Sequence, residues 1–336
     1  MKPDEVLDPF KSWHIPFSRW VEDGVGWIVE EYRPFFQSVK WPIDQLLRAL
    51  DGALNGIPPV ITILCFGLVA WQIAGGRLAL QIVGLLVAIG LLGIWSDTMT
   101  TLSLVFTAVL FCTVVGIPMG VMAARSDRAA AICRPILDTM QTVPSFVYLV
   151  PVVMLFGIGN VPGVIVTIVF ALPPVIRLTT LGIQQVSEEV VEAMRAFGAS
   201  DTQLLFKAQI PLALPSILAG INQTLMMSLS MVVVASMIAV GGLGQMVLRG
   251  IGRLDIGQAT TGGTGIVLLA IVLDRLTQSA MSRSRQFAHV AWYRRGPSGL
   301  LMGLLTKPFQ GSPAPREGSE NGRQQVSTKY GSEYER

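Results

Sequence analysis

The sequence has few charged residues for its length. Only 14% of its 336 residues are charged, whereas 51% are hydrophobic, and the mean hydropathy is +0.56. A soluble protein of this size needs more polar surface than these residues supply. The formal net charge is only +3, so the balance of charge does not indicate a nucleic-acid partner. The scarcity of charge therefore predicts an integral membrane protein.

Reactive side chains are also scarce, and none of them is arranged as a site. The three cysteines, Cys65, Cys112 and Cys133, are divided between apolar runs and a basic loop, which argues against a disulfide framework. The two histidines, His14 and His289, lie in the tails, and no HExxH motif or other paired metal-ligand spacing occurs. We expect no catalysis, no metal and no other cofactor on this chain.

The motif that binds ATP is missing too. A phosphate-binding P-loop needs Gly-Lys followed by Ser or Thr, and no lysine in this sequence follows a glycine. The glycine-rich run Thr261–Gly265 contains no lysine, and it predicts a close turn before the last apolar run. If the protein uses ATP, another polypeptide has to hydrolyse it.

What the sequence does contain is long apolar runs. A membrane-spanning helix needs roughly 20 mainly apolar residues. Seven windows approach this length: Ile57–Ala74, Leu78–Trp95, Met99–Ala123, Pro144–Gly159, Val161–Leu181, Leu214–Val240 and Gly265–Leu276. We predict an all-α integral membrane protein with about seven transmembrane helices, whose transmembrane domain covers residues 57–281.

Basic residues gather on alternate connections between these runs. One set of connections carries Arg77, Arg125, Arg128, Arg134, Arg195, Lys207, Arg283, Arg285, Arg294 and Arg295. The other set carries only Arg249 and Arg253. Because cytoplasmic loops hold the excess of Lys and Arg, we place residues 187–213 in the cytoplasm. The same count puts the N-terminus outside and the C-terminus in the cytoplasm.

Two tails flank the predicted transmembrane domain. The N-terminal tail, residues 1–56, contains three tryptophans at intervals of seven residues: Trp13, Trp20 and Trp27. This spacing suits a helix that lies in the membrane interface with its tryptophans at the level of the lipid headgroups. Prolines and glycines within the same stretch favour a packed extramembrane tail instead, so both alternatives stay open. The C-terminal tail, residues 282–336, has the Gly, Ser, Pro, Glu and Arg content of a largely disordered cytoplasmic segment.

One polar stretch, EEVVEAMRAFGASDTQLLFKAQIPLALP (188–215), separates two apolar runs. Ser187 can cap a helix start, and Gly198 stands at the left-handed position that ends a helix. Ser200 and Gln203 then have the spacing of a capping box. The stretch therefore predicts a helix, a glycine corner and a second helix.

The first of these helices has an apolar face. Val190, Met194 and Phe197 follow the spacing of three to four residues that places side chains on one side of a helix. A helix this short is marginal on its own in water, so it needs a surface to pack against. That surface is either the protein's own bundle or a cytoplasmic partner.

A resemblance bears on this choice. Glu192, Ala193, Gly198 and the segment Ala208-Gln209-Ile210-Pro211 resemble the EAA loop of permease subunits of bacterial ABC importers. Met194 and Ala208 depart from that pattern at the third position and at its isoleucine. The similarity extends from about residue 95 to 276, including the segments 138–179 and 222–255, and it indicates the permease family of glycine betaine/proline betaine ABC importers.

The resemblance implies a complete transport machine. It implies a type I ABC importer permease core in the bacterial cytoplasmic (inner) membrane, working as a homodimer on two ATP-binding subunits. ATP and Mg²⁺ are then expected on those partner subunits, and an extracytoplasmic binding protein delivers the substrate. The resemblance also implies which residues couple the permease to the ATPase: Glu192, Ala193, Arg195, Phe197, Gly198 and Pro211.

The prediction of the substrate depends on the resemblance alone. It implies import of glycine betaine, proline betaine or a related quaternary ammonium osmoprotectant. The same architecture importing choline, carnitine or another small solute stays open as an alternative. An ion-coupled secondary transporter and an osmosensing channel are further alternatives. The near absence of carboxylates at mid-membrane argues against ion coupling.

Uncharged polar residues are candidates to line the translocation pathway, and prolines are candidates for hinges. On the sixth run, Asn222 and Ser230 are candidate pathway residues, although polar residues in spans commonly form hydrogen bonds between helices instead. Pro144, Pro173 and Pro174 are candidate hinges because proline removes a helical hydrogen bond.

Asp274 and Arg275 form the one acid–base pair noted within a predicted span. An ionisable residue in a span is by default a functional hypothesis. Structural anchoring near the cytoplasmic end is the alternative that we favour.

Overall fold

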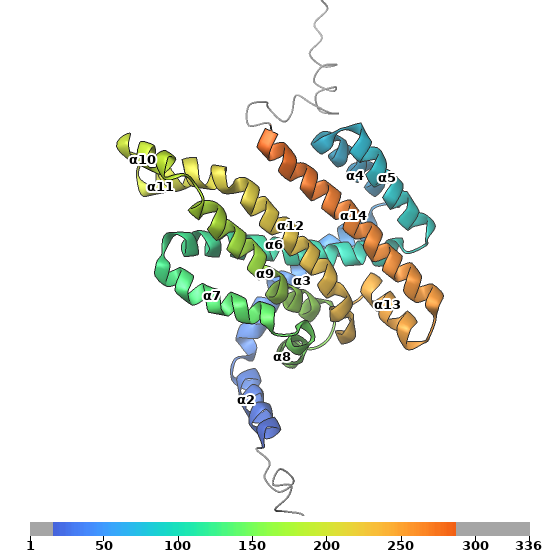
Figure 1. Cartoon of the computed structure of the whole chain (residues 1–336). Coiled ribbons are helices and arrows are strands. Elements are labelled where there is room, and N and C mark those ends of the chain that lie inside the picture. The colour runs from blue at the N-terminus through green and yellow to red at the C-terminus, as the bar shows by residue number, and fades with distance from the viewer. Residues whose placement is uncertain (1–15, 287–336) are drawn as a thin grey trace, which may run out of the picture.

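The computed structural model describes residues 16–286, and the chain is helical over nearly all of that range (Figure 1). Within that range, four helices are long and apolar enough to cross a membrane: α6 (Trp95–Arg125), α9 (Asn160–Gln184), α12 (Ile210–Ala235, within the run 201–238) and α14 (Ile256–Gln286). At about 1.5 Å per residue, α9 is roughly 37 Å long and exceeds the apolar thickness of a bilayer. The prediction of an all-α membrane fold is confirmed.

The remaining predicted spans are shorter or bent. α4 (Pro59–Ala74) follows α3 (Arg33–Gly56) at a bend of 106°, and α5 (Gly76–Leu91) is a short apolar helix. α7 (Asp127–Thr142) meets η2 (Ser145–Tyr148) and α8 (Leu149–Phe156) at a bend of 104°. Counting each bent pair as one span gives up to six candidate spans, and α5 occupies the one predicted window that remains.

Proline explains where these bends occur. Val143, which precedes Pro144, has ψ 128°, the extended conformation that proline imposes on its predecessor. The candidate hinge Pro144 therefore stands at the bend between α7 and α8. Pro173 and Pro174 differ, because both are buried inside the unbroken helix α9.

The N-terminal segment is helical. It contains α2 (Phe17–Glu31) and α3, and α3 packs against α6, α8 and α9. Trp20 and Trp27 on α2 are 63% and 61% exposed. Figure 1 shows α2 extending away from the bundle. Trp13 and residues 287–336 of the C-terminal tail lie outside the described residues.

Glycines bring the central helices close together. A Cβ at Gly120 on α6 would lie 2.6 Å from Thr179 Cβ on α9, and one at Gly116 would lie 2.3 Å from Val175 Cγ1. On α12, a Cβ at Gly220 would lie 3.0 Å from Val175 Cα. Small residues allow this close approach in membranes, where dispersion contacts and interhelical hydrogen bonds hold helices together. The core is therefore formed by α6, α9 and α12.

The glycine-rich run near the last span has a different role from the predicted one. Thr261–Gly265 lies inside α14, so the prediction of a turn there is wrong. Gly262 and Gly265 instead let α14 pack tightly on Leu243 of α13 (Leu243–Gly252). The chain turns at Arg253–Asp255, where Leu254 has a φ of +57°.

Candidate functional site

The polar stretch forms the predicted helix, corner and second helix. α10 (Glu188–Ala196) is followed by a corner at Gly198, whose φ is +77°. At this corner the backbone N–H of Ala199 donates a hydrogen bond to Met194 O at 3.0 Å. α11 (Asp201–Leu204) starts with a complete capping box. In it, Gln203 N donates to Ser200 Oγ at 3.3 Å and Ser200 N donates to Gln203 Oε1 at 3.0 Å. The corner is therefore held by local hydrogen bonds at both sides.

One detail of the predicted cap is wrong. Ser187 precedes α10 as expected, but its side chain makes no capping hydrogen bond. Glu188 and Glu189 occupy the first turn, where their charge complements the positive end of the helix dipole.

The surface of this loop is exposed and partly hollow. A cavity of about 620 Å³ lies beneath α10 and is lined by residues that include Glu188, Glu192, Arg195 and Asp201. Arg195 and Asp201 approach each other to 3.9 Å, but both are well exposed, so this ion pair contributes little stability. Phe197, at the corner, is 91% exposed. An aromatic side chain this exposed, next to a rigid corner, is available for contact with another protein.

The return to the membrane passes through a π-helical turn. η3 (Leu205–Gln209) precedes α12, and Pro211 stands exposed in the first turn of α12. Proline leaves the carbonyl four residues earlier without its helical donor, which suits a local change in helical pitch. The position of Pro211 four residues after Lys207 is a sequence signal for this irregularity.

The structure separates the predicted coupling residues into two groups. Glu192 and Arg195 line the cavity beneath α10, and Ala193 is exposed on the same helix. Phe197 and Gly198 form the corner, whereas Pro211 lies at the start of α12. Figure 1 shows α10 and α11 projecting from the ends of α9 and α12, away from the rest of the bundle.

The two candidate pathway residues have different surroundings. Asn222 is half-buried, and its Oδ1 accepts a hydrogen bond from Thr277 Oγ1 on α14. This is the interhelical bond that stood as the alternative to a pathway role. Ser230 is exposed on α12, and its hydroxyl donates to Met226 O at 3.1 Å.

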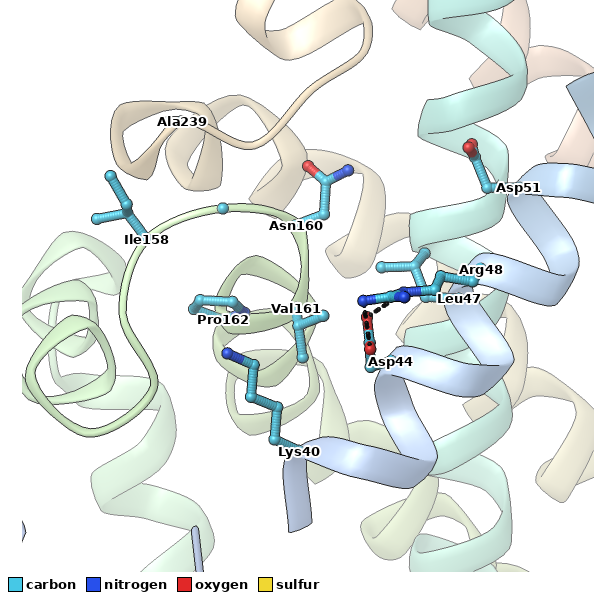
Figure 2. Close-up of a pocket in the computed structure, with 11 residues that line it drawn as sticks. Lys40, Asp44, Leu47, Arg48, Asp51, Ile158, Asn160, Val161, Pro162 and Ala239 are labelled. Carbon is cyan, nitrogen blue, oxygen red and sulfur yellow. Dashed lines mark hydrogen bonds and ion pairs between the residues drawn. The ribbon is translucent and has the colours of Figure 1, made fainter. Parts of the chain in front are cut away.

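A second polar cavity lies away from the coupling loop. It measures about 490 Å³, is open to one side, and is lined by residues of α3, of the α8–α9 connection and of the start of α9 (Figure 2). In it Arg48 and Asp44 form an ion pair at 2.8 Å, and Lys40 Nζ donates to Phe156 O at 3.2 Å. Asn160 Oδ1 accepts from the backbone N–H of Gly241 at 2.8 Å. The Lys40 bond holds α3 to the end of α8, and the Asn160 bond holds the start of α9 to the segment that follows α12.

Sequence reasoning missed one charged pair between α7 and α9. Arg177 Nη2 on α9 donates to Asp138 Oδ1 on α7, although the two residues are 39 positions apart. The signal was present, because Arg177 is the only charged residue of α9.

Among residues 16–286, no group of three or more His, Cys, Asp or Glu side chains is placed to hold a metal ion.

Comparison with known proteins identifies the family. A family model described as the inner membrane component of binding-protein-dependent transport systems matches residues 116–283. The glycine betaine/proline betaine permease protein ProW of Escherichia coli (strain K12) is 59% identical over 304 residues, which cover 90% of this chain and 85% of ProW. This chain belongs to the binding-protein-dependent transport permeases.

Two further relatives place this permease within ABC importers. The glycine betaine/carnitine permease protein GbuB of Listeria monocytogenes (serotype 1/2a, strain 10403S) is 42% identical, with 81% of this chain and 97% of GbuB covered. An inward-facing structure of the MetNI methionine ABC transporter has a TM-score of 0.50 and 26% identity, with 57% of this chain and 94% of that chain covered. The chain is therefore an inner-membrane, multi-pass transport subunit with an ABC importer permease fold, and not an enzyme.

Proposed function

We propose that this permease imports glycine betaine, proline betaine or a closely related quaternary ammonium osmoprotectant as part of an ATP-driven transporter. The observation that carries the proposal is the 59% identity with ProW across 90% of the chain. Such identity spans the central helices as well as the coupling loop. A shared pathway and a shared ATPase surface are both consistent with it.

The other components of the proposed transporter are separate polypeptides. Two copies of this permease pair with two ATP-binding subunits, which bind ATP and Mg²⁺, and an extracytoplasmic binding protein delivers the substrate. The absence of any Gly-Lys-Ser/Thr motif supports this division, because the chain has no P-loop with which to bind ATP phosphates.

The coupling element is α10 with its glycine corner. Its short length, the hydrogen-bonded corner at Gly198 and the exposed Phe197 support a role as a rigid docking element seated in the ATPase. Glu192, Ala193, Arg195, Gly198 and Pro211 are proposed to act with it. Movement of the ATPase subunits would then be passed to α9 and α12, the helices on either side.

The proposed orientation puts α10 and the C-terminal end of α14 in the cytoplasm. Figure 1 shows both of these on the same side of the bundle, whereas α8 and α13 lie on the other. The excess of Arg and Lys on the α10 side supports the assignment. The segment that holds α2 and α3 then begins outside.

The proposal is tested by uptake of labelled glycine betaine at high salt. Cells without their own osmoprotectant uptake express the permease with its ATPase and binding protein, or with the binding protein alone. We expect uptake only when the ATPase is present. Uptake without the ATPase would overturn ATP coupling and favour a channel or a secondary transporter.

Unlabelled competitors test the substrate. Glycine betaine and proline betaine should compete with the label, and carnitine and choline are added in parallel because GbuB is named for carnitine as well. Competition by carnitine or choline alone would move the substrate assignment to that compound. A complex that assembles but takes up none of the four would contradict the osmoprotectant assignment.

A further inference from the structure

Arg177 lies deep inside an apolar helix. It is the only charged residue among the 25 residues of α9, and the neighbouring helix α12 contains none. The last residue of α9, Gln184, is seven positions further along the chain, so the Arg177 Cα lies roughly 10 Å from that end. A charged side chain within an apolar helix is costly unless it faces a partner or a water-filled space, or reaches the membrane interface. The position of Arg177 therefore needs an explanation.

Asp138 on α7 supplies only part of that explanation. One nitrogen of the guanidinium, Nη2, donates to Asp138 Oδ1, and several N–H donors of Arg177 are left for a second acceptor. The two side chains remain 39% and 65% exposed in the isolated chain. A half-exposed carboxylate is not stable against hydrocarbon, so the opening in front of this pair faces water, a second copy of the chain or a passing solute.

A cavity next to this pair is large enough for a small solute. A cavity of about 300 Å³ separates α7 from α9, and its lining includes Cys133, Arg134, Leu137, Ile176, Arg177 and Thr180. The walls are mainly apolar, with the two guanidinium groups as their charged features. None of the residues that line the cavity is aromatic. Asp138 is not one of the lining residues, but it is bonded to Arg177, which is. A quaternary ammonium group bound next to Arg177 would therefore be balanced by the Asp138 carboxylate beside the cavity and not by an aromatic cage.

We propose that Arg177 and Asp138 form a zwitterion-binding site on the import pathway. The carboxylate of the solute binds the Arg177 guanidinium, and its quaternary ammonium group faces Asp138 while its methyl groups contact the apolar wall. The inference rests on the proposed function, because it assumes a zwitterionic betaine as the substrate.

The exchange is balanced in charge. One ion pair within the protein is replaced by two contacts with the solute, so neither Arg177 nor Asp138 is left unpaired in a low-dielectric region. When the solute leaves, the two side chains pair again. A site of this design binds the solute transiently, as a transport pathway requires.

Uptake by the assembled transporter is the first test. The permease, its ATPase and its binding protein are reconstituted in proteoliposomes, and uptake of labelled glycine betaine is measured with saturating binding protein. We compare the wild type with Arg177→Gln, Asp138→Asn, the double variant with both changes, and Arg275→Gln. Arg275 is the matched control, an exposed arginine toward the C-terminal end of α14.

The double variant separates a substrate site from a structural ion pair. Removing one partner of such a pair leaves an uncompensated charge, but removing both does not. If the pair were only structural, the double variant would regain wild-type uptake. We expect instead that it assembles with normal basal ATPase activity and still loses about tenfold or more of its uptake, the effect of one lost charge-assisted hydrogen bond. Arg275→Gln should keep wild-type uptake.

Cys133 provides a readout of binding that does not depend on transport. In a variant with Cys65→Ser and Cys112→Ser, the rate of maleimide labelling of Cys133 is measured with and without saturating glycine betaine. Sucrose at equal osmolarity is the control. We expect glycine betaine to slow labelling in the wild-type background and to have no effect when Arg177→Gln and Asp138→Asn are both added.

Each outcome decides between the proposals. Failure of the wild-type complex to import glycine betaine would overturn the proposed function itself. Wild-type import with full uptake by the double variant, or with no protection of Cys133, would overturn the zwitterion site alone. A Cys133 that never reacts, with or without ATP, would also overturn it, because the cavity would then be sealed in an interface.

Discussion

Replacing Phe197 with alanine should weaken assembly with the ATPase while leaving the fold of the permease intact. The side chain is 91% exposed, so its removal takes away almost no contact within the chain. Exposed substitutions of this kind change the free energy of unfolding by no more than about 0.5 kcal/mol. If Phe197 becomes fully buried in the ATPase, its burial contributes about 1.5–3 kcal/mol at each docking site. That corresponds to a roughly 10- to 150-fold weaker dissociation constant for Phe197→Ala.

The assay is a titration of permease in lipid nanodiscs with purified ATPase subunit, followed by biolayer interferometry. Thermal unfolding of the isolated permease is measured in parallel. Leu254→Ala is the matched control, because Leu254 is 89% exposed but lies at the α13–α14 connection, away from α10. Equal affinity of Phe197→Ala and the wild type would refute the assignment of the corner as the docking surface. A fall in unfolding temperature as large as the loss of affinity would refute the claim that the effect is local.

Three further changes test other parts of the structure. Gly198→Val should reduce ATP-dependent uptake several-fold while Gly198→Asn is tolerated, because at a φ of +77° a β-branched residue is strained by roughly 1–2 kcal/mol. Gly120→Ala should lower the unfolding temperature, because the new Cβ would lie 2.6 Å from Thr179 Cβ and such overpacking costs about 1–3 kcal/mol. Gly84→Ala on α5 is the control: its Cβ would meet no atom within 4 Å, so the unfolding temperature should not fall. Asn222→Leu should lower stability by about 1 kcal/mol through loss of the bond from Thr277, and a fall in uptake at unchanged stability would instead support a pathway role.

Local signals explain what could be predicted from the sequence. The corner at Gly198 and the capping box at Ser200 depend on residues within a few positions of one another, so their spacing is sufficient to predict them. The long spans were predictable because bilayer thickness sets a minimum apolar length. Hydropathy windows could not show that Val143–Pro144 ends one helix and starts another at a 104° bend, because they average over the break.

Glycine was harder to interpret than hydropathy. Glycine terminates a helix at Gly198, whereas at Gly262 it allows α14 to pack closely on α13. These two roles can be told apart only when the position of the neighbouring helix is known. The run Thr261–Gly265 was therefore mistaken for a turn. Arg177 and Asp138 show a similar limit for charge: Arg177 stands out as the one charged residue of α9, but a partner 39 residues away leaves no local pattern that would identify it.

The packing of α9 explains how docking at α10 could reach the pair formed by Arg177 and Asp138. A Cβ at Gly182 would lie 2.7 Å from Ser216 Cβ of α12, and Thr224 Oγ1 of α12 donates to Ala171 O of α9 at 2.9 Å. α9 and α12 are thus locked together over several turns. α7 is held to α9 less tightly, with a solute-sized cavity between them. Under the proposed coupling, a pull on α10 moves α9 and α12 as one body, and the place where that body shifts against its neighbour is the cavity that contains Arg177.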